Sequence, residues 1–152
     1  MTPGKLSEKV IVERSDWVRG MLVRIRALPL GSLEEFTSEP VTVDAAESCL
    51  RRALEALLDL GRHILAKGFG DAPAEYRQVA ERLGAQGVLD AGEAEVFGRM
   101  AGYRNRLVHF YDRVSDQELY EICQGRLADV EAVLAALHRW VRTHPERIDR
   151  EL

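Results

Sequence analysis

The residues best suited to chemistry lie together in residues 98–113, GRMAGYRNRLVHFYDR. This segment holds Arg104, His109 and Tyr111. A guanidinium presents a rigid fork of donors that matches two phosphate oxygens, and it stays charged at any working pH. An imidazole titrates near neutrality, so it can take a proton from a hydroxyl or give one to a leaving oxygen. Together the two groups suit the cleavage of a phosphodiester.

A helix is expected to position these side chains. Apolar residues recur there at steps of three and four: Val96, Phe97, Met100, Tyr103 and Leu107. This period predicts an amphipathic helix over about residues 91–109, capped by Asp90. On that helix His109 lies about a quarter-turn from the face that carries Arg104. The β-branched and aromatic run over 108–111 lowers helix propensity, so the helix is predicted to end there.

The string MAGYRNRLVHFY, residues 100–111, resembles the Arg-x-x-x-x-His-x-Tyr motif of HepT-like ribonuclease toxins, members of the HEPN superfamily. The resemblance implies a metal-independent endoribonuclease that cleaves RNA through attack of a 2′-hydroxyl, with neither a cofactor nor a metal. It implies that Arg104 and His109 are catalytic and that Asn105 and Arg106 support catalysis or bind RNA. It also implies a two-fold homodimer, since two motif copies in one groove would supply an acid and a base.

The same resemblance implies a protein partner. HepT-like toxins of type VII toxin–antitoxin systems are neutralised by an antitoxin with the minimal nucleotidyltransferase fold, MntA-like. That antitoxin transfers AMP from ATP to the motif tyrosine, which is Tyr111 in this sequence. Added phosphates would repel the RNA phosphate that the site must accept. The expected partners are therefore RNA, this antitoxin and a second copy of the chain.

A second polar row lies on a long helix predicted over about residues 43–68. Glu55, Asp59 and His63 step by four along one face of it. Three interpretations stay open. The row is a surface line of ion pairs with neighbouring arginines, or one acid orients a catalytic side chain across the bundle, or the row binds a metal. The acid–acid–histidine spacing also resembles the second helix of the HepT-like pattern, which gives Glu55 and Asp59 a supporting role.

The remaining periodicity predicts an all-α fold. We expect an antiparallel bundle of four main helices plus one short helix, forming a single HEPN-like domain over residues 1–152. The ends, about 1–4 and 146–152, are expected to be flexible. The predicted helices cover about residues 5–28, 43–68, 73–83, 91–109 and 116–143.

Several signals set the ends of these helices. Thr42 or Asp44 is expected to cap the second long helix. The string Ser115-Asp-Gln-Glu118 has the form of a capping box for the last one. Trp140 near its end is expected in the core or at a subunit interface, and the sequence does not choose between them.

Composition and charge indicate where the protein acts and which of its surfaces are basic. No apolar run approaches the roughly 20 residues of a membrane span, so a cytoplasmic protein is expected, with Cys49 and Cys123 as buried thiols. The net charge is −4, but residues 1–30 hold six basic against three acidic residues, and residues 99–113 hold four against one. With eighteen arginines and only three lysines, most arginines are expected on solvated faces. The basic first helix is either such a face or one wall of an RNA groove.

Alternative functions stay open. The chain is a ribonuclease toxin, a non-catalytic HEPN module that binds and assists a partner nucleotidyltransferase, or another enzyme that uses the acid–acid–histidine row. Without the resemblance, Arg104 and His109 also fit a structural role, in which they tie helices together through buried hydrogen bonds.

Overall fold

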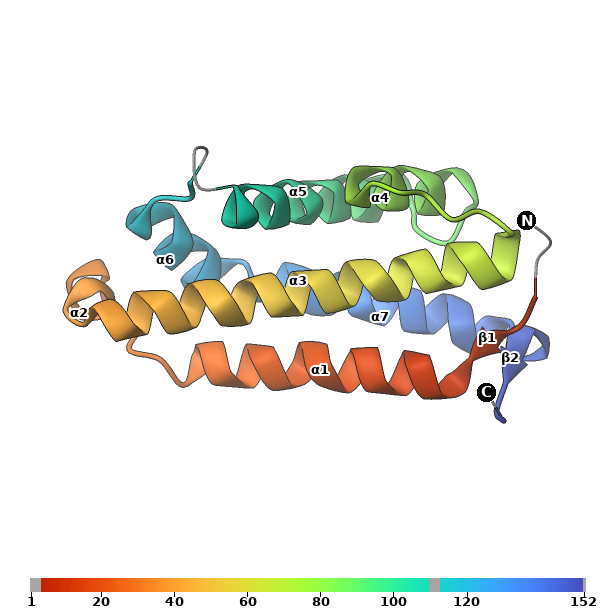
Figure 1. Ribbon diagram of the computed structural model, residues 1–152, viewed down its shortest axis with the longest axis horizontal. Coiled ribbons are helices and arrows are strands. Elements are labelled where there is room, and N and C mark those ends of the chain that lie inside the picture. The colour runs from red at the N-terminus through yellow and green to blue at the C-terminus, as the bar shows by residue number, and fades with distance from the viewer. Residues whose placement is uncertain (1–3, 110–112, 152) are drawn as a thin grey trace.

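The computed structural model describes residues 4–109 and 113–151, and helices dominate that part of the chain (Figure 1). The four long helices are α1 (Glu8–Arg26), α3 (Pro40–Phe69), α5 (Ala91–Val108) and α7 (Leu127–Thr143). The three shorter ones are α2 (Leu33–Thr37), α4 (Tyr76–Ala85) and α6 (Asp116–Gly125). The predicted all-α fold is confirmed.

Helix α3 is the centre of the bundle, and Figure 1 shows it between antiparallel α1 on one side and α4 and α5 on the other. Its largest fully buried side chains are Leu50, Leu54, Leu57, Leu58, Leu60 and Ile64. Burying one such side chain stabilises the fold by about 1.5–3 kcal/mol. Gly61 allows α4 and α5 to approach α3: a Cβ there would stand 3.0 Å from Leu83 and Val79 and 3.2 Å from Phe97.

The start of α3 differs from the prediction. The helix begins at Pro40, with Glu39 as N-cap, so capping by Thr42 or Asp44 is wrong. Proline favours the first turn of a helix because its φ is preset and its missing N–H would have no partner there. The preceding segment, expected to be a loop, contains the short α2. The short helix expected from residue 73 begins at Tyr76.

The predicted last helix is two helices. Ser115 caps α6 as expected, accepting a hydrogen bond from the Glu118 N–H at 3.1 Å. The helix ends at Gly125, and Arg126 leaves helical geometry at φ −119° and ψ 1° before α7 begins. Glycine is a poor helix former, which favours a break at this position without requiring one. Two apolar segments with one continuous period therefore fold as separate helices.

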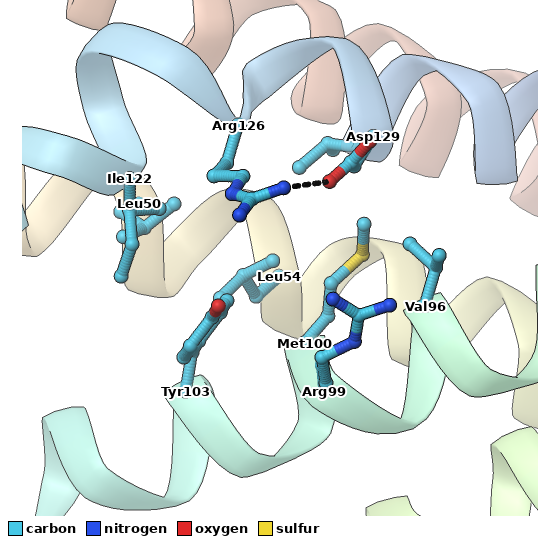
Figure 2. A pocket seen from close by; sticks show the side chains of 10 residues that line it. Leu50, Leu54, Val96, Arg99, Met100, Tyr103, Ile122, Arg126 and Asp129 are labelled. Atoms are coloured by element: carbon cyan, nitrogen blue, oxygen red, sulfur yellow. Dashed lines mark ion pairs between the residues drawn. The ribbon is translucent and has the colours of Figure 1, made fainter.

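Figure 2 shows the pocket at this break, where Arg126 reaches Asp129 and lies near Leu50 and Ile122. The ion pair measures 3.8 Å. The pocket holds only about 20 Å³, roughly enough for one water molecule. Most of its lining side chains are apolar, so we interpret it as a packing seam between α3, α5, α6 and the start of α7.

Residues 145–149, after α7, have regular structure. A 3-10 turn over Pro145–Arg147 follows α7, and the strand β2 (Ile148–Asp149) pairs in parallel with β1 (Leu6–Ser7). Secondary structure does not measure mobility, so the flexibility expected for residues 146–152 stays a prediction. The pairing places half-buried Ile148 beside fully buried Leu6. Each of the two strands is too short to show an alternating apolar pattern in the sequence.

Burial settles the open question about Trp140 and confirms the prediction for the two cysteines. Trp140 is 8% exposed and packs against Phe69 and His144, so it belongs to the core. Cys49 and Cys123 are buried free thiols, as predicted. Burial raises the pKa of the Cys123 thiol to about 12, which keeps it protonated. Within residues 4–109 and 113–151, no helix combines the length and hydropathy needed to cross a bilayer.

Candidate active site

Helix α5 begins and ends as the sequence predicts. The Asp90 carboxylate accepts a hydrogen bond from the Glu93 N–H at 2.7 Å, and the Glu93 carboxylate accepts one from the Asp90 N–H at 3.0 Å. This capping box satisfies two backbone donors at the start of the helix. At the other end Val108 is the last helical residue, and His109 is extended at φ −100° and ψ 102°. The helix end therefore turns the histidine away from the helical face.

Arg104, Asn105 and His109 line one solvent-open cavity of about 370 Å³. The rest of its wall comes from α3, from the segment before α4 and from α4 itself: Arg62, Ala74, Glu75, Tyr76 and Arg77. His109 is exposed and the Arg104 side chain is 25% exposed. The structure thus brings both catalytic candidates to one opening.

Arg104 is held by contacts from three helices. Its Nη2 lies 3.8 Å from Glu55 Oε2 on α3, and its Nη1 donates a hydrogen bond to Asn105 Oδ1 at 3.3 Å. Its guanidinium carbon lies 4.8 Å from the ring centroid of Tyr76 on α4, within cation–π range. Its Nε is buried and has no hydrogen-bond partner among the described residues. Hydrogen-bonding capacity therefore remains on a guanidinium that is already fixed in place.

Tyr76 is a site residue that the sequence placed on the core face of its helix. Its hydroxyl donates a hydrogen bond to Asp59 Oδ1 at 2.8 Å, and Arg62 lies over its ring at 4.6 Å. Burial, followed by the bond to Asp59, raises the pKa of Tyr76 above its ordinary value of 10.0, so the hydroxyl stays a donor at neutral pH. An aromatic side chain at the start of a short helix was the one sequence feature that could have pointed to Tyr76 as a site residue. Its spacing, however, matched that of the core residues of the same helix.

The contacts of Glu55 and Asp59 agree with parts of two interpretations that the sequence left open, the row of local ion pairs and the contact across the bundle. Glu55 accepts a hydrogen bond from Arg51 at 2.7 Å on α3 and also faces Arg104 across the bundle. Asp59 pairs with Arg62 at 3.6 Å and accepts the hydroxyl of Tyr76. Each acid therefore joins a local ion pair to a contact that positions the cavity wall.

His63 has a separate role. Its Nε2 accepts a hydrogen bond from the Ser7 N–H at 2.9 Å, where β1 meets α1. Burial lowers the pKa of His63, and the nearby charges of Lys67 and Arg14 lower it further, so the neutral form that accepts this bond is favoured. In the part of the chain that the structure describes, no three His, Cys, Asp or Glu side chains are grouped to hold a metal ion.

Arg106 lies outside the cavity of Arg104. Its two terminal nitrogens each approach a carboxylate oxygen of Glu118 at 2.8 Å, a bidentate pair between α5 and α6. Both side chains are about one-third exposed, at 34% and 33%. The geometry makes Arg106 a link between helices. Tyr111 falls within residues 110–112, outside the described residues.

Comparison with known proteins identifies the family. The family model described as ribonuclease HepT-like matches residues 21–137, which include α5 and the whole cavity wall. A putative RNase of Archaeoglobus fulgidus is 30% identical over 113 residues, covering 74% of this chain and 80% of that protein.

Two solved structures share the fold. A tri-AMPylated Shewanella oneidensis HEPN toxin in complex with MNT antitoxin has a TM-score of 0.78 at 21% identity, covering 86% of this chain and 97% of that one. The cytosolic protein of unknown function YutE from Bacillus subtilis has a TM-score of 0.80 at 16% identity, covering 96% and 98%. At these identities the likeness shows the fold alone. The family match confirms the resemblance seen in the sequence: this chain belongs to the HepT-like ribonuclease family.

Proposed function

We propose that this protein is the toxin of a HepT/MntA-type toxin–antitoxin system and acts as a metal-independent endoribonuclease. The observation that carries the proposal is the shared cavity of Arg104 and His109, the two motif residues at the end of α5. Arg62 and Arg77 add positive charge to the same wall, against the single carboxylate of Glu75. An anionic substrate such as a phosphodiester suits this balance of charge.

The proposed reaction uses the ribose next to the scissile phosphate. His109 takes the proton of the 2′-hydroxyl, and the resulting oxygen attacks phosphorus. The bond from phosphorus to the 5′-oxygen breaks, and that oxygen leaves with a proton. Arg104 holds the non-bridging oxygens and stabilises the added negative charge of the transition state. The products are a 2′,3′-cyclic phosphate and a 5′-hydroxyl.

The neighbouring residues act through Arg104. Glu55 and Asn105 hold its guanidinium by an ion pair and a hydrogen bond, and the ring of Tyr76 supports it. Asp59 in turn fixes Tyr76 through its hydroxyl. These residues are positioning residues, because an arginine that is fixed in advance needs no reorganisation when charge develops on the phosphate.

A second proton-transfer group is needed for the leaving oxygen, because one histidine serves poorly as base and acid in the same step. We place it on a second copy of the chain, whose His109 would face the same groove across a two-fold axis. Sedimentation of the purified protein tests this arrangement. A strictly monomeric protein with full activity would exclude it.

Neutralisation is proposed to act on Tyr111, two residues beyond His109. The Shewanella neighbour is itself tri-AMPylated and bound to an MNT antitoxin. By analogy, the Tyr111 oxygen would attack the α-phosphorus of ATP, with release of pyrophosphate, and leave AMP on the tyrosine. Intact mass after co-expression with a nucleotidyltransferase encoded beside this protein tests the step. The mass should rise by whole AMP residues, and Tyr111→Phe should gain none.

The ribonuclease activity is tested with labelled RNA in the presence of a chelator. Arg104→Ala and His109→Ala should each lower the cleavage rate by roughly 100-fold or more, in line with the loss of transition-state stabilisation or proton transfer. Arg82→Ala is the matched control, since Arg82 pairs with Asp71 at 2.6 Å outside the cavity. Cleavage at the control rate by both site variants would refute the assignment.

A second candidate function is a non-catalytic module that binds and assists a nucleotidyltransferase. The neighbour in complex with an MNT antitoxin favours this alternative as far as partner binding is concerned. It predicts that the purified protein leaves RNA intact and still co-purifies with the nucleotidyltransferase.

A further inference from the structure

A second opening lies on the other side of α3, between α3 and α1. Its volume is about 140 Å³, and we call it the α1–α3 groove. Its lining residues are Arg14 and Trp17 of α1 and Arg51, Arg52, Glu55, Ala56 and Asp59 of α3. Trp17 is 49% exposed, in contrast to the other tryptophan of the chain, Trp140, at 8%. An indole left half in solvent beside arginines is an unusual surface feature that calls for a physical reason.

The acidic side chains of this groove have ion-pair partners, whereas two of its arginines have none among the residues that the structure describes. Its two carboxylates are engaged, Glu55 by Arg51 and Arg104 and Asp59 by groups on the cavity side. Arg14 and Arg52 are both exposed, and neither has an ion pair or hydrogen bond within residues 4–109 and 113–151. The groove therefore presents two cations without salt-bridge partners and one aromatic ring, over acids that are already paired.

This surface is poorly suited to an apolar protein partner. The other exposed apolar residues of α1, Val12 and Val23, do not line the groove, so the indole of Trp17 lies among charged neighbours. A protein that covered it would have to desolvate the arginines. Proteins that bind single-stranded nucleic acid use this combination, since the ring stacks on a base while the cations contact the backbone phosphates.

The α1–α3 groove and the catalytic cavity are adjacent. Glu55 lines the groove and contacts Arg104 of the cavity, while Asp59 lines the groove and bonds Tyr76 of the cavity. Figure 1 shows α3 between α1 and α4, so one helix separates the openings. A helix with its side chains is about 10–12 Å across. A strand that leaves the cavity would reach the groove within a few nucleotides.

We propose that Trp17, Arg14 and Arg52 form a secondary binding site for single-stranded RNA, in which the indole stacks on a base and the two guanidiniums bind neighbouring phosphates. The inference rests on the proposed ribonuclease function and extends it to a part of the substrate away from the cleaved bond. It also selects between the two interpretations of the basic first helix, because α1 then forms one wall of an RNA groove.

The test is binding of an RNA that cannot be cleaved by 2′-hydroxyl attack. A single-stranded 2′-O-methyl oligonucleotide of about eight nucleotides covers a typical site. It should quench the fluorescence of exposed Trp17 in the wild-type protein. Trp17→Ala should weaken binding, measured by anisotropy of a labelled oligonucleotide, by roughly 5- to 150-fold, the range for one stacked base. Arg14→Ala and Arg52→Ala should weaken binding and reduce its salt dependence.

Arg24→Ala is the matched control, because Arg24 is an exposed arginine of α1 that does not line the groove. Affinities of Trp17→Ala and Arg52→Ala equal to that of the control would overturn the inference. It is also overturned if Trp17→Ala abolishes self-association in sedimentation while RNA affinity stays unchanged, since the surface then binds a second copy.

The outcomes separate this inference from the proposed function. Cleavage by the wild-type protein, with RNA affinity independent of Trp17, contradicts the secondary site alone. Trp17-dependent binding without cleavage of any RNA supports the secondary site and contradicts catalysis.

Discussion

Tyr76 offers a sharp test of how the site is positioned. Its ring supports Arg104 at 4.8 Å and Arg62 at 4.6 Å, while its hydroxyl holds Asp59 at 2.8 Å. Tyr76→Phe removes the hydrogen bond and keeps the ring, whereas Tyr76→Leu removes both. A hydrogen bond to a charged group contributes about 1.5–3 kcal/mol, and a partly exposed cation–π contact about 0.5–2 kcal/mol.

Both variants should therefore lose about 1.5–3 kcal/mol of unfolding free energy through the lost bond to Asp59. Only Tyr76→Leu should also release Arg104. If the lost cation–π energy appears in the transition state, its kcat/KM for RNA cleavage should fall by roughly a further 2- to 30-fold below that of Tyr76→Phe.

The assay combines urea unfolding with cleavage of a short labelled RNA at a temperature where both variants remain folded. Affinity for an uncleavable oligonucleotide serves as a second measurement, because a misplaced guanidinium also weakens phosphate binding. Equal kcat/KM values for the two variants would show that the ring does not position Arg104, and would refute the reasoning.

Three further predictions concern the scaffold. Gly61→Ala should lower the free energy of unfolding by about 1–3 kcal/mol in urea titrations, since the new methyl meets three buried side chains at 3.0–3.2 Å; an unchanged midpoint would show that the core relaxes freely. Arg106 and Glu118 should couple by about 1 kcal/mol in a double-mutant cycle, because the pair is bidentate yet one-third exposed; zero coupling contradicts the proposed link. Burial lowers the folded-state pKa of His63 below 6.5, so the unfolded chain binds its proton first as the pH falls. Wild-type stability should therefore drop below pH 6.5 more steeply than that of His63→Gln, and parallel pH profiles would contradict it.

The motif helix was predictable because every signal for it is local. Asp90 and Glu93 form a capping box in sequence, the apolar period lies within one helix, and the β-branched run near Val108 ends it. The resemblance read from the sequence rests on the same short segment, whereas the family model matches the much longer stretch 21–137. Local sequence therefore determined both the helix and the candidates Arg104 and His109.

The cavity wall was not predictable in the same way. Tyr76 has the period of a core residue, and nothing in the sequence shows that its ring faces Arg104, which lies 28 positions further along the chain. The contact between Glu55 and Arg104 was one of three open interpretations, because a row spaced by four says nothing about the helix that faces it. The partner of Arg106 is likewise set by the packing of α6 on α5.

The break between α6 and α7 shows a further limit. The apolar period runs on through Arg126, so the sequence favours one helix. The cost of Gly125 inside a helix, about 1 kcal/mol, is small beside the burial of several apolar side chains on either side. Packing against α3 therefore decides where the chain bends.

The most direct test of the central claim is the chemistry of the cut RNA ends. Wild-type protein should cleave an oligoribonucleotide in the presence of a chelator and leave a 2′,3′-cyclic phosphate, detected by mass spectrometry. It should leave the matching strand with a 2′-deoxy sugar at the cleavage site intact. Products with 3′-hydroxyl ends, or cleavage of the deoxy-substituted strand at the same position, would contradict the proposed roles of Arg104 and His109.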